Sequence, residues 1–87
     1  MGNSNSIKEI PSQFKLYPNP VQNILNIETI NHVQKLEILT LTGQLIRQKN
    51  NFSNTPFIET SELDRGLYFL KITERNGNTS FLKFIKL

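Results

Sequence analysis

The sequence lacks the residue types on which many functional sites depend. Its 87 residues include no Cys, which excludes a disulfide framework, a Cys-ligated zinc site, an iron–sulfur cluster and a thiol nucleophile. The single His, His32, lies in an expected loop, where an exposed side chain is the common case. No apolar run reaches the ~18 residues of a membrane-spanning helix. We therefore expect no metal, no cofactor and no insertion into a membrane.

Catalytic motifs are missing as well. The chain has no glycine-rich phosphate loop, and its carboxylates do not follow the alternating spacing of a calcium-binding loop. Ser61 precedes Glu62, but neighbouring side chains diverge, and the Ser-x-x-Asp pattern that ends at Asp64 is typical of a helix-start cap. Because no nucleophile is placed beside a base, we expect the protein not to be an enzyme. The start of the chain also lacks the pattern of a signal peptide.

Alanine, the best helix former, is also absent, whereas Ile, Thr and Asn number ten, seven and eleven. β-branched residues favour strands and Asn favours turns, so this composition predicts an all-β protein. The length allows one small domain with a single core. Residues 1–13 are polar and show no strand pattern, so we expect a linker or a remnant of cloning there, followed by the folded domain at residues 14–87.

Seven short strands are predicted, separated by turn residues. Their ranges are 14–17, 24–28, 34–41, 44–48, 56–59, 66–75 and 78–87. Thr42-Gly43 predicts a two-residue hairpin turn in which Gly43 supplies a positive φ, and Asn76-Gly77 predicts a second hairpin. Short strands at this spacing favour an antiparallel β-sandwich of two sheets.

One motif sharpens the predicted fold to an immunoglobulin-like sandwich. Asp64, Gly66 and Tyr68 have the Asp-x-Gly-x-Tyr spacing found where a tyrosine hydroxyl bonds to backbone upstream and fixes a corner between strands. Leu70 occupies the place where such domains often have a Cys, and an apolar residue there is the expected substitute. The alternative is an ordinary strand with a half-buried Tyr.

The aromatic and apolar residues of the predicted strands are expected to form the core. Five Phe belong to this group: Phe14, Phe57, Phe69, Phe81 and Phe84. In the last strand Leu82, Ile85 and Leu87 are expected to pack with them, whereas Lys83 and Lys86 keep their ammonium groups in water. There is no Trp, and Phe52 is the only aromatic residue in a loop. Flat aromatic platforms for a sugar are therefore not evident.

The net charge of +3 arises entirely from the last 17 residues. Six cationic and six acidic side chains cancel over residues 1–70, and residues 71–87 contain four cations and Glu74. Four cations on alternating strand faces form a thin patch, so a solvated edge is favoured over a charged partner, and no nucleic acid is expected.

The order of several short motifs resembles one known family. These motifs are Tyr17-Pro18-Asn19-Pro20, Leu25-Asn26-Ile27, Leu36-Glu37-Ile38, Leu41-Thr42-Gly43-Gln44-Leu45-Ile46, Ile58-Glu59-Thr60-Ser61, Leu63-Asp64-Arg65-Gly66-Leu67-Tyr68-Phe69-Leu70 and Lys83-Phe84-Ile85-Lys86. Over residues 14–87 the chain looks like the type A C-terminal sorting domain of the type IX (Por) secretion system of Bacteroidetes. Thr40 departs from the Asp or Asn common in that family, but its hydroxyl can still cap a turn.

The resemblance implies a seven-stranded immunoglobulin-like sandwich attached to a larger secreted protein. Such a domain is a non-catalytic address for an outer-membrane secretion translocon, and a sortase then cleaves it off. The parent protein would pass through the periplasm to the outer-membrane surface or the exterior. The alternative is a carbohydrate-binding or adhesion sandwich that stays on a secreted enzyme and uses loop residues such as His32 or Phe52.

The resemblance also suggests where the translocon would bind. The candidate recognition residues are Lys83, Phe84, Ile85, Lys86 and Leu87 in the last strand, Gly66 and Tyr68 at the corner, and Pro18, Asn19 and Pro20. An exposed last strand could also pair edge to edge with a second copy, so we expect a monomer or a weak edge-strand dimer.

Overall fold

The computed structural model describes residues 13–51 and 53–87, and over this part of the chain the regular structure consists of β-strands alone. The seven strands are β2 (Lys15–Tyr17), β3 (Ile24–Glu28), β4 (Val33–Leu39), β5 (Leu45–Asn50), β6 (Phe57–Glu59), β7 (Gly66–Glu74) and β8 (Thr79–Lys86). The all-β composition and the seven predicted strands are therefore confirmed. The proposed linker lies outside the described residues, except for Gln13.

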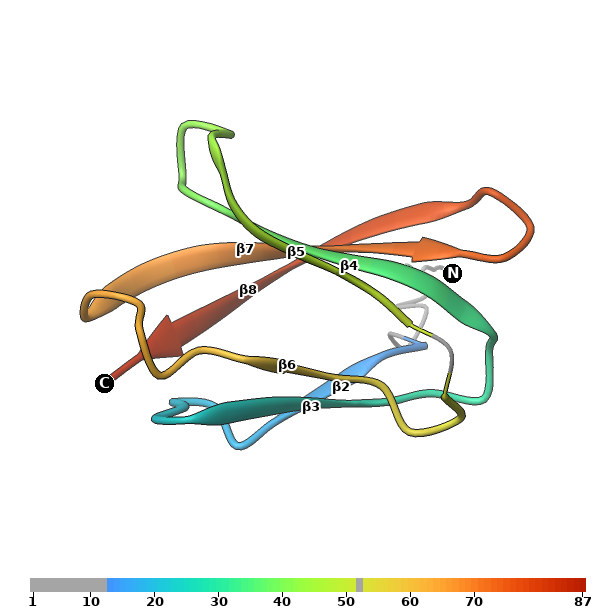
Figure 1. The fold of residues 1–87 in the computed structure, drawn as a ribbon, viewed down its shortest axis with the longest axis horizontal. Helices are drawn as coiled ribbons and strands as arrows, with labels where there is room; N and C mark the ends of the chain where they lie inside the picture. Colours follow the sequence, from blue (N-terminus) through green and yellow to red (C-terminus); the bar gives the residue numbers. More distant parts are fainter. Residues whose placement is uncertain (1–12, 52) are drawn as a thin grey trace, which may run out of the picture.

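The strands form two antiparallel sheets that face each other (Figure 1). One sheet has the strand order β2-β3-β6, and the other has the order β5-β4-β7-β8. The strands β7 and β8 pair along almost their whole length, from Gly66 opposite Lys86 to Thr73 opposite Thr79. In the order of the described strands β8 comes last, so it is an edge strand of the larger sheet within this part of the chain.

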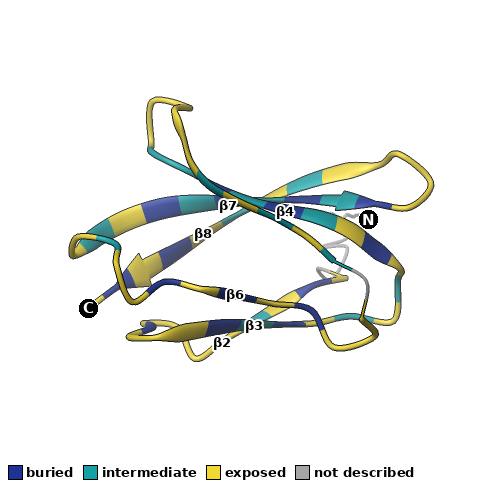
Figure 2. Ribbon diagram, viewed as in Figure 1, coloured by how far each residue is buried: buried dark blue, intermediate teal, exposed yellow. Residues whose placement is uncertain are grey.

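The core lies between the two layers (Figure 2). In β7 every second residue from Tyr68 onward is buried, as expected for a strand with one face against a core, and in β4 a register shift separates buried Val33 from buried Leu36 and Ile38. The fully buried side chains include Leu25 and Ile58 from the smaller sheet and Leu36, Leu70 and Ile72 from the larger sheet. Burial of one such side chain contributes about 1.5–3 kcal/mol, so the interlocked inner faces hold the layers together. Leu70 is fully buried, as expected for an apolar residue at its position in the sequence motif.

The turn between β4 and β5 differs from the predicted two-residue hairpin. Thr40 and Gln44 close the loop, with the Thr40 N–H donating to the Gln44 carbonyl at 2.9 Å and the Gly43 N–H donating to the Thr40 carbonyl at 2.9 Å. Gly43 has φ +93°, so its positive φ is confirmed, but it follows the tight turn at residues 41–42 and forms the third loop residue. A three-residue loop, in which a tight turn is followed by a residue with positive φ, is a common connection in hairpins.

Thr40 caps this turn through its hydroxyl, as its position in the motif led us to expect. Its Oγ1 accepts a hydrogen bond from the Gln44 N–H at 3.0 Å and lies 2.9 Å from the Thr42 hydroxyl. The hairpin predicted at Asn76-Gly77 is present, since it joins β7 to β8, but its loop also has three residues: the Glu74 N–H donates to the Asn78 carbonyl at 2.8 Å, and the Gly77 N–H donates to the Glu74 carbonyl at 2.9 Å. The segment at Ser61 forms a single turn, closed by the Leu63 N–H on the Thr60 carbonyl at 3.0 Å, without a helix.

Candidate recognition surface at the last strand

The last strand brings the predicted recognition segments together at one end of the molecule. Gly66 lies opposite Lys86, and Tyr68 lies opposite Phe84, because β7 and β8 are paired neighbours. Asn19 reaches the same strand from the other side, where its Oδ1 accepts a hydrogen bond from the Ile85 N–H at 2.9 Å. Asn19 and Ile85, which are 66 residues apart in the sequence, thus belong to one continuous surface.

The corner predicted at Tyr68 is present. The Tyr68 hydroxyl donates to the Asp64 carbonyl at 2.6 Å, which ties the start of β7 to the preceding loop. The Tyr68 ring stacks on Phe84, with ring centroids 5.7 Å apart and an interplanar angle of 24°. Gly66, which lies between Asp64 and Tyr68 in the sequence, has φ +155°, a backbone conformation that L side chains rarely adopt. The corner and the last strand therefore support each other.

The side chains of β8 alternate between the core and the solvent. Leu82, Phe84 and Lys86 point inward, whereas Phe81, Ile85 and Leu87 are 57%, 44% and 53% exposed. The expectation that all the apolar residues of this strand pack in the core is therefore wrong for the outward three. Phe57 in β6 is exposed for the same reason. Its neighbour Ile58 is buried, and neighbouring residues of a strand point to opposite faces.

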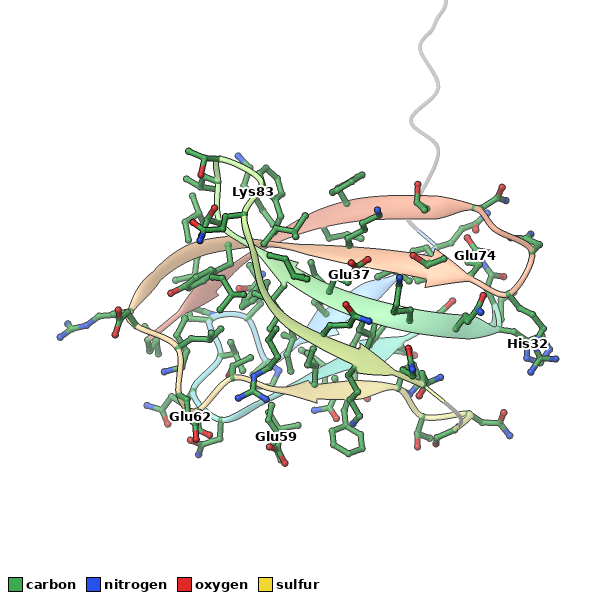
Figure 3. The ribbon with its side chains drawn as sticks, turned by 45° about the horizontal axis from the view of Figure 1, so that its top comes forward. His32, Glu37, Glu59, Glu62, Glu74 and Lys83 are labelled. Carbon is green, nitrogen blue, oxygen red and sulfur yellow. The ribbon has the colours of Figure 1, made fainter. Side chains whose placement is uncertain are left out.

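Lys86 contradicts the expectation that both lysines of the last strand lie in water. Lys86 is only 7% exposed, because it shares the inward face with Phe84. Its Nζ donates to the main-chain oxygen of Leu87 at 3.0 Å, and no Asp or Glu carboxylate among the described residues lies within ion-pair distance. Lys83 is exposed, as expected, on the outer side of the larger sheet (Figure 3).

Part of the outer edge of β8 is covered by the segment that follows Asn19. The Val21 N–H donates to the Ile85 carbonyl at 2.8 Å, and the Leu87 N–H donates to the Val21 carbonyl at 2.9 Å. These bonds form a short parallel bridge between Val21 and Lys86. Both Pro18 and Pro20 follow cis peptide bonds, and this segment links β2 to the bridge. Val21 is fully buried, and its contact with the last strand was not predicted from the sequence.

The outer face of the larger sheet contains charged side chains among exposed apolar ones. Glu37 lies 3.9 Å from the Lys35 Nζ and 4.0 Å from the Lys71 Nζ, and its Oε1 has no hydrogen-bond partner. The Lys71 ammonium also lies 5.8 Å from the centroid of the Phe81 ring. Lys83, opposite Phe69, forms no ion pair with any residue that the structure describes.

The exposure of apolar residues beside Lys83 was not predicted from the sequence either. Leu67 is 40% exposed and lies opposite Ile85, and Phe69 is half-buried opposite Lys83. The outward positions of β7 and β8 therefore form a mixed apolar and cationic surface. The spacing of Leu67, Phe69 and Lys71 shows that these residues share one face of the strand. It does not show whether that face is the inner or the outer one.

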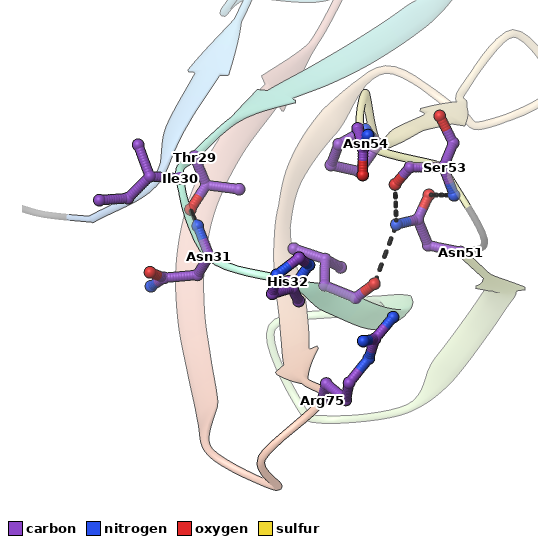
Figure 4. Close-up of a pocket in the computed structure, with 10 residues that line it drawn as sticks. Thr29, Ile30, Asn31, His32, Asn51, Ser53, Asn54 and Arg75 are labelled. Carbon is purple, nitrogen blue, oxygen red and sulfur yellow. Dashed lines mark hydrogen bonds between the residues drawn. The ribbon is translucent and has the colours of Figure 1, made fainter.

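A polar pocket lies at the opposite end of the sheets from the corner (Figure 4). Asn51 organises it by donating from Nδ2 to the Val33 carbonyl at 2.9 Å and to the Ser53 carbonyl at 2.8 Å. His32 and Arg75 also line the pocket, but no Phe, Tyr or Trp does so within the described ranges. Phe52, named in the carbohydrate-binding alternative, lies outside the described residues.

No metal or membrane-spanning feature accompanies these surfaces in residues 13–51 and 53–87. Groups of three or more His, Cys, Asp or Glu side chains that could hold a metal ion are absent there. The same residues contain no helix long and apolar enough to cross a membrane.

The comparison with known families decides which kind of domain this is. The family described as secretion system C-terminal sorting domain matches residues 15–86, nearly the whole described chain. The chain belongs to the Por secretion system C-terminal sorting domain family. No curated protein matches it. The matched range starts at β2 and ends with β8, so it includes all seven strands.

Membership of this family gives the domain its function. It is a non-catalytic sorting domain for type IX secretion, as the motif order predicted. A sorting domain interacts with secretion machinery, and its parent protein is delivered to the cell surface or the exterior.

Proposed function

We propose that this sorting domain addresses its parent protein to the outer-membrane translocon of the type IX system while the parent is in the periplasm. The family match over residues 15–86 is the observation on which this proposal rests. A sortase then removes the domain, and the parent reaches the surface or the exterior. The partners of the domain are thus two proteins, a translocon component and a protease.

The translocon contacts the surface around the last strand. In support, the three segments predicted from the sequence lie together there, and Lys83, Ile85 and Leu87 are exposed on it. Phe84 and Lys86 are buried, so their role is to position the strand. Gly66 and Tyr68 form the corner beside it, and the exposed residues Pro18, Asn19 and Pro20 flank its edge.

The sortase cleaves before the folded part, in or just upstream of residues 1–13. Cleavage within the two sheets would require unpairing of strands such as β7 and β8, whereas the sequence of residues 1–13 shows no strand pattern. Mass spectrometry of the mature parent protein would locate its new C-terminus. A C-terminus within residues 20–87 would contradict this proposal.

The fold is of the immunoglobulin-like kind. The sheet orders β2-β3-β6 and β5-β4-β7-β8 support this, since a seven-stranded domain of that kind divides its strands between two packed antiparallel sheets. The bond from the Tyr68 hydroxyl to the Asp64 carbonyl at the start of β7 agrees with the tyrosine corner of those domains.

A secretion assay tests the address function directly. The 87-residue chain is fused to the C-terminus of a periplasmic fluorescent protein in a bacterium with type IX secretion. We expect fluorescence in the medium or on the cell surface, and retention in the periplasm both for the unfused cargo and in a strain without the translocon. Periplasmic retention of the folded fusion would reject the proposal and favour an accessory sandwich that stays on its parent.

A further inference from the structure

Among the described residues, the outer edge of β8 is covered over one part of its length and has no covering segment over the rest. The Ile85 N–H and carbonyl point away from β7, because they bond to Asn19 and Val21. In an antiparallel pair, backbone groups alternate between the neighbouring strand and the outside. The N–H and carbonyl groups of Lys83 and Phe81 must therefore also point outward. We call the stretch from Thr79 to Lys83 the open edge.

The open edge offers backbone partners to an additional strand. No residue of the part of the chain that the structure describes pairs with it on the outer side, since β8 is the last strand of its sheet. Unpaired edge groups of this kind are a template for an extended segment of another chain. The Val21 bridge, which adds backbone bonds to Ile85 and Leu87, shows that the same edge accepts such pairing.

The side chains along the open edge define the chemistry of a matching segment. Phe81 and Lys83 both project to the outer face, and Phe81 is 57% exposed. Ile85 and Leu67 continue this surface with apolar side chains. A segment laid along the open edge would meet the Phe81 ring and, two residues further on, the Lys83 ammonium, because every second residue of a strand lies on one face.

We propose that the open edge binds an extended segment of a secretion-machinery protein in which a carboxylate residue alternates with apolar residues. The segment adds a strand beside β8, and its carboxylate pairs with the Lys83 ammonium on the outer face. This inference rests on the proposed address function and gives the chemistry of the partner at that site.

The excess of lysines on the outer face of the larger sheet favours a partner with a carboxylate over a second copy of this chain. The outer face contains Lys35, Lys71 and Lys83 against Glu37 alone, and Glu37 already lies near the first two lysines. Lys83 has no ion pair among the described residues, so it is the cation available to a partner. A second copy would bring its own Lys83 to the same edge, and lysine on an edge strand counteracts such self-pairing.

Substitutions of Lys83 test the charge contribution both alone and together with the backbone contribution. Lys83→Pro removes the outward N–H together with the ammonium group, and edge strands tolerate the loss of this N–H because it does not bond to the sheet. Lys83→Glu keeps the N–H and reverses the charge, and Lys83→Arg keeps both features. In the secretion assay we expect at least tenfold less export for the Pro and Glu variants, and export within twofold of the parent for Arg.

The assay distinguishes failure of the inference from failure of the address function. If the unchanged fusion is not exported, the proposed function fails and the inference falls with it. If the unchanged fusion and the Lys83→Glu variant are exported equally, the address function stands and the inference is overturned. Because Lys83 is exposed, the Glu variant is expected to fold, and its melting curve provides the check if the Pro variant unfolds.

Amide hydrogen exchange of the purified 87-residue chain tests whether the edge is open. We expect the amides of Phe81 and Lys83 to exchange at least tenfold faster than those of Leu82 and Phe84, at every protein concentration. Protection of Phe81 and Lys83 in the isolated chain would overturn the inference, whether a second copy or residues 1–12 provided it. Protection that grows with concentration would identify the second copy as the occupant.

Discussion

The two ends of the last strand differ in nearly every structural respect. From Phe84 onward, β8 inserts an aromatic ring and a lysine stem between the sheets, and Asn19 and Val21 cover its edge. From Thr79 to Lys83, the outward side chains are exposed and the edge has no covering segment among residues 13–51 and 53–87. One strand thus contains a part that fixes the fold and a part that faces outward.

This difference suggests how a small domain can combine stability with recognition. An added strand needs an edge that is open but does not fray, and fraying is limited when neighbouring residues are fixed by packing. Phe84 and the Tyr68 corner fix the strand next to the open edge, so they support recognition without contact with the partner. Variants of the two parts should therefore affect stability and export differently.

The largest difference in stability is expected between the two aromatic residues of the strand. Phe84→Ala removes a ring that is 1% exposed and stacked on Tyr68, and it should lower the free energy of unfolding by about 3–5 kcal/mol. The control Phe81→Ala removes a ring that is 57% exposed and should change it by less than about 1 kcal/mol. Urea denaturation measures both values, and equal losses would contradict the inward and outward assignment.

The two lysines provide a second, smaller contrast. Lys86→Glu places a carboxylate where the side chain is 7% exposed, so we expect a loss of roughly 2–3 kcal/mol. Lys83→Glu should change stability by less than about 0.5 kcal/mol, because the side chain lies in water. Lys86→Met is the matched control, since it keeps a flexible stem without the charge. Thermal melts that are the same for both Glu variants would show that Lys86 is solvated.

Most of the fold could be predicted from the sequence, because its signals are local. Strand positions followed from β-branched runs bounded by turn residues, and Tyr68 was placed at its corner by spacing to Asp64 and Gly66. The hairpin at Gly43 was displaced by one residue, since a glycine marks the need for positive φ but does not fix the length of the loop.

The candidate site was harder to predict because both faces of the last strand are apolar. Leu82 and Phe84 on one face and Phe81 and Ile85 on the other give no period-two contrast, so the pattern does not tell which face meets the core. Lys86 is buried only because it shares a face with Phe84. The Val21 bridge depends on a contact between residues far apart in sequence, for which no local pattern exists.

The smallest expected effect concerns the boundary between the covered and the open edge. Asn19→Ala removes the acceptor of the Ile85 N–H, an exposed neutral hydrogen bond, so it should lower stability by only about 0.5–1 kcal/mol. The effect on hydrogen exchange should be larger than the effect on stability, because the Ile85 amide would then exchange at a rate close to that of the Lys83 amide. The control Asn23→Ala removes an exposed side chain on the same loop and should leave the Ile85 amide unchanged. If Ile85 stays protected in Asn19→Ala, the boundary does not depend on this side chain, and the Val21 bridge alone sets where the open edge begins.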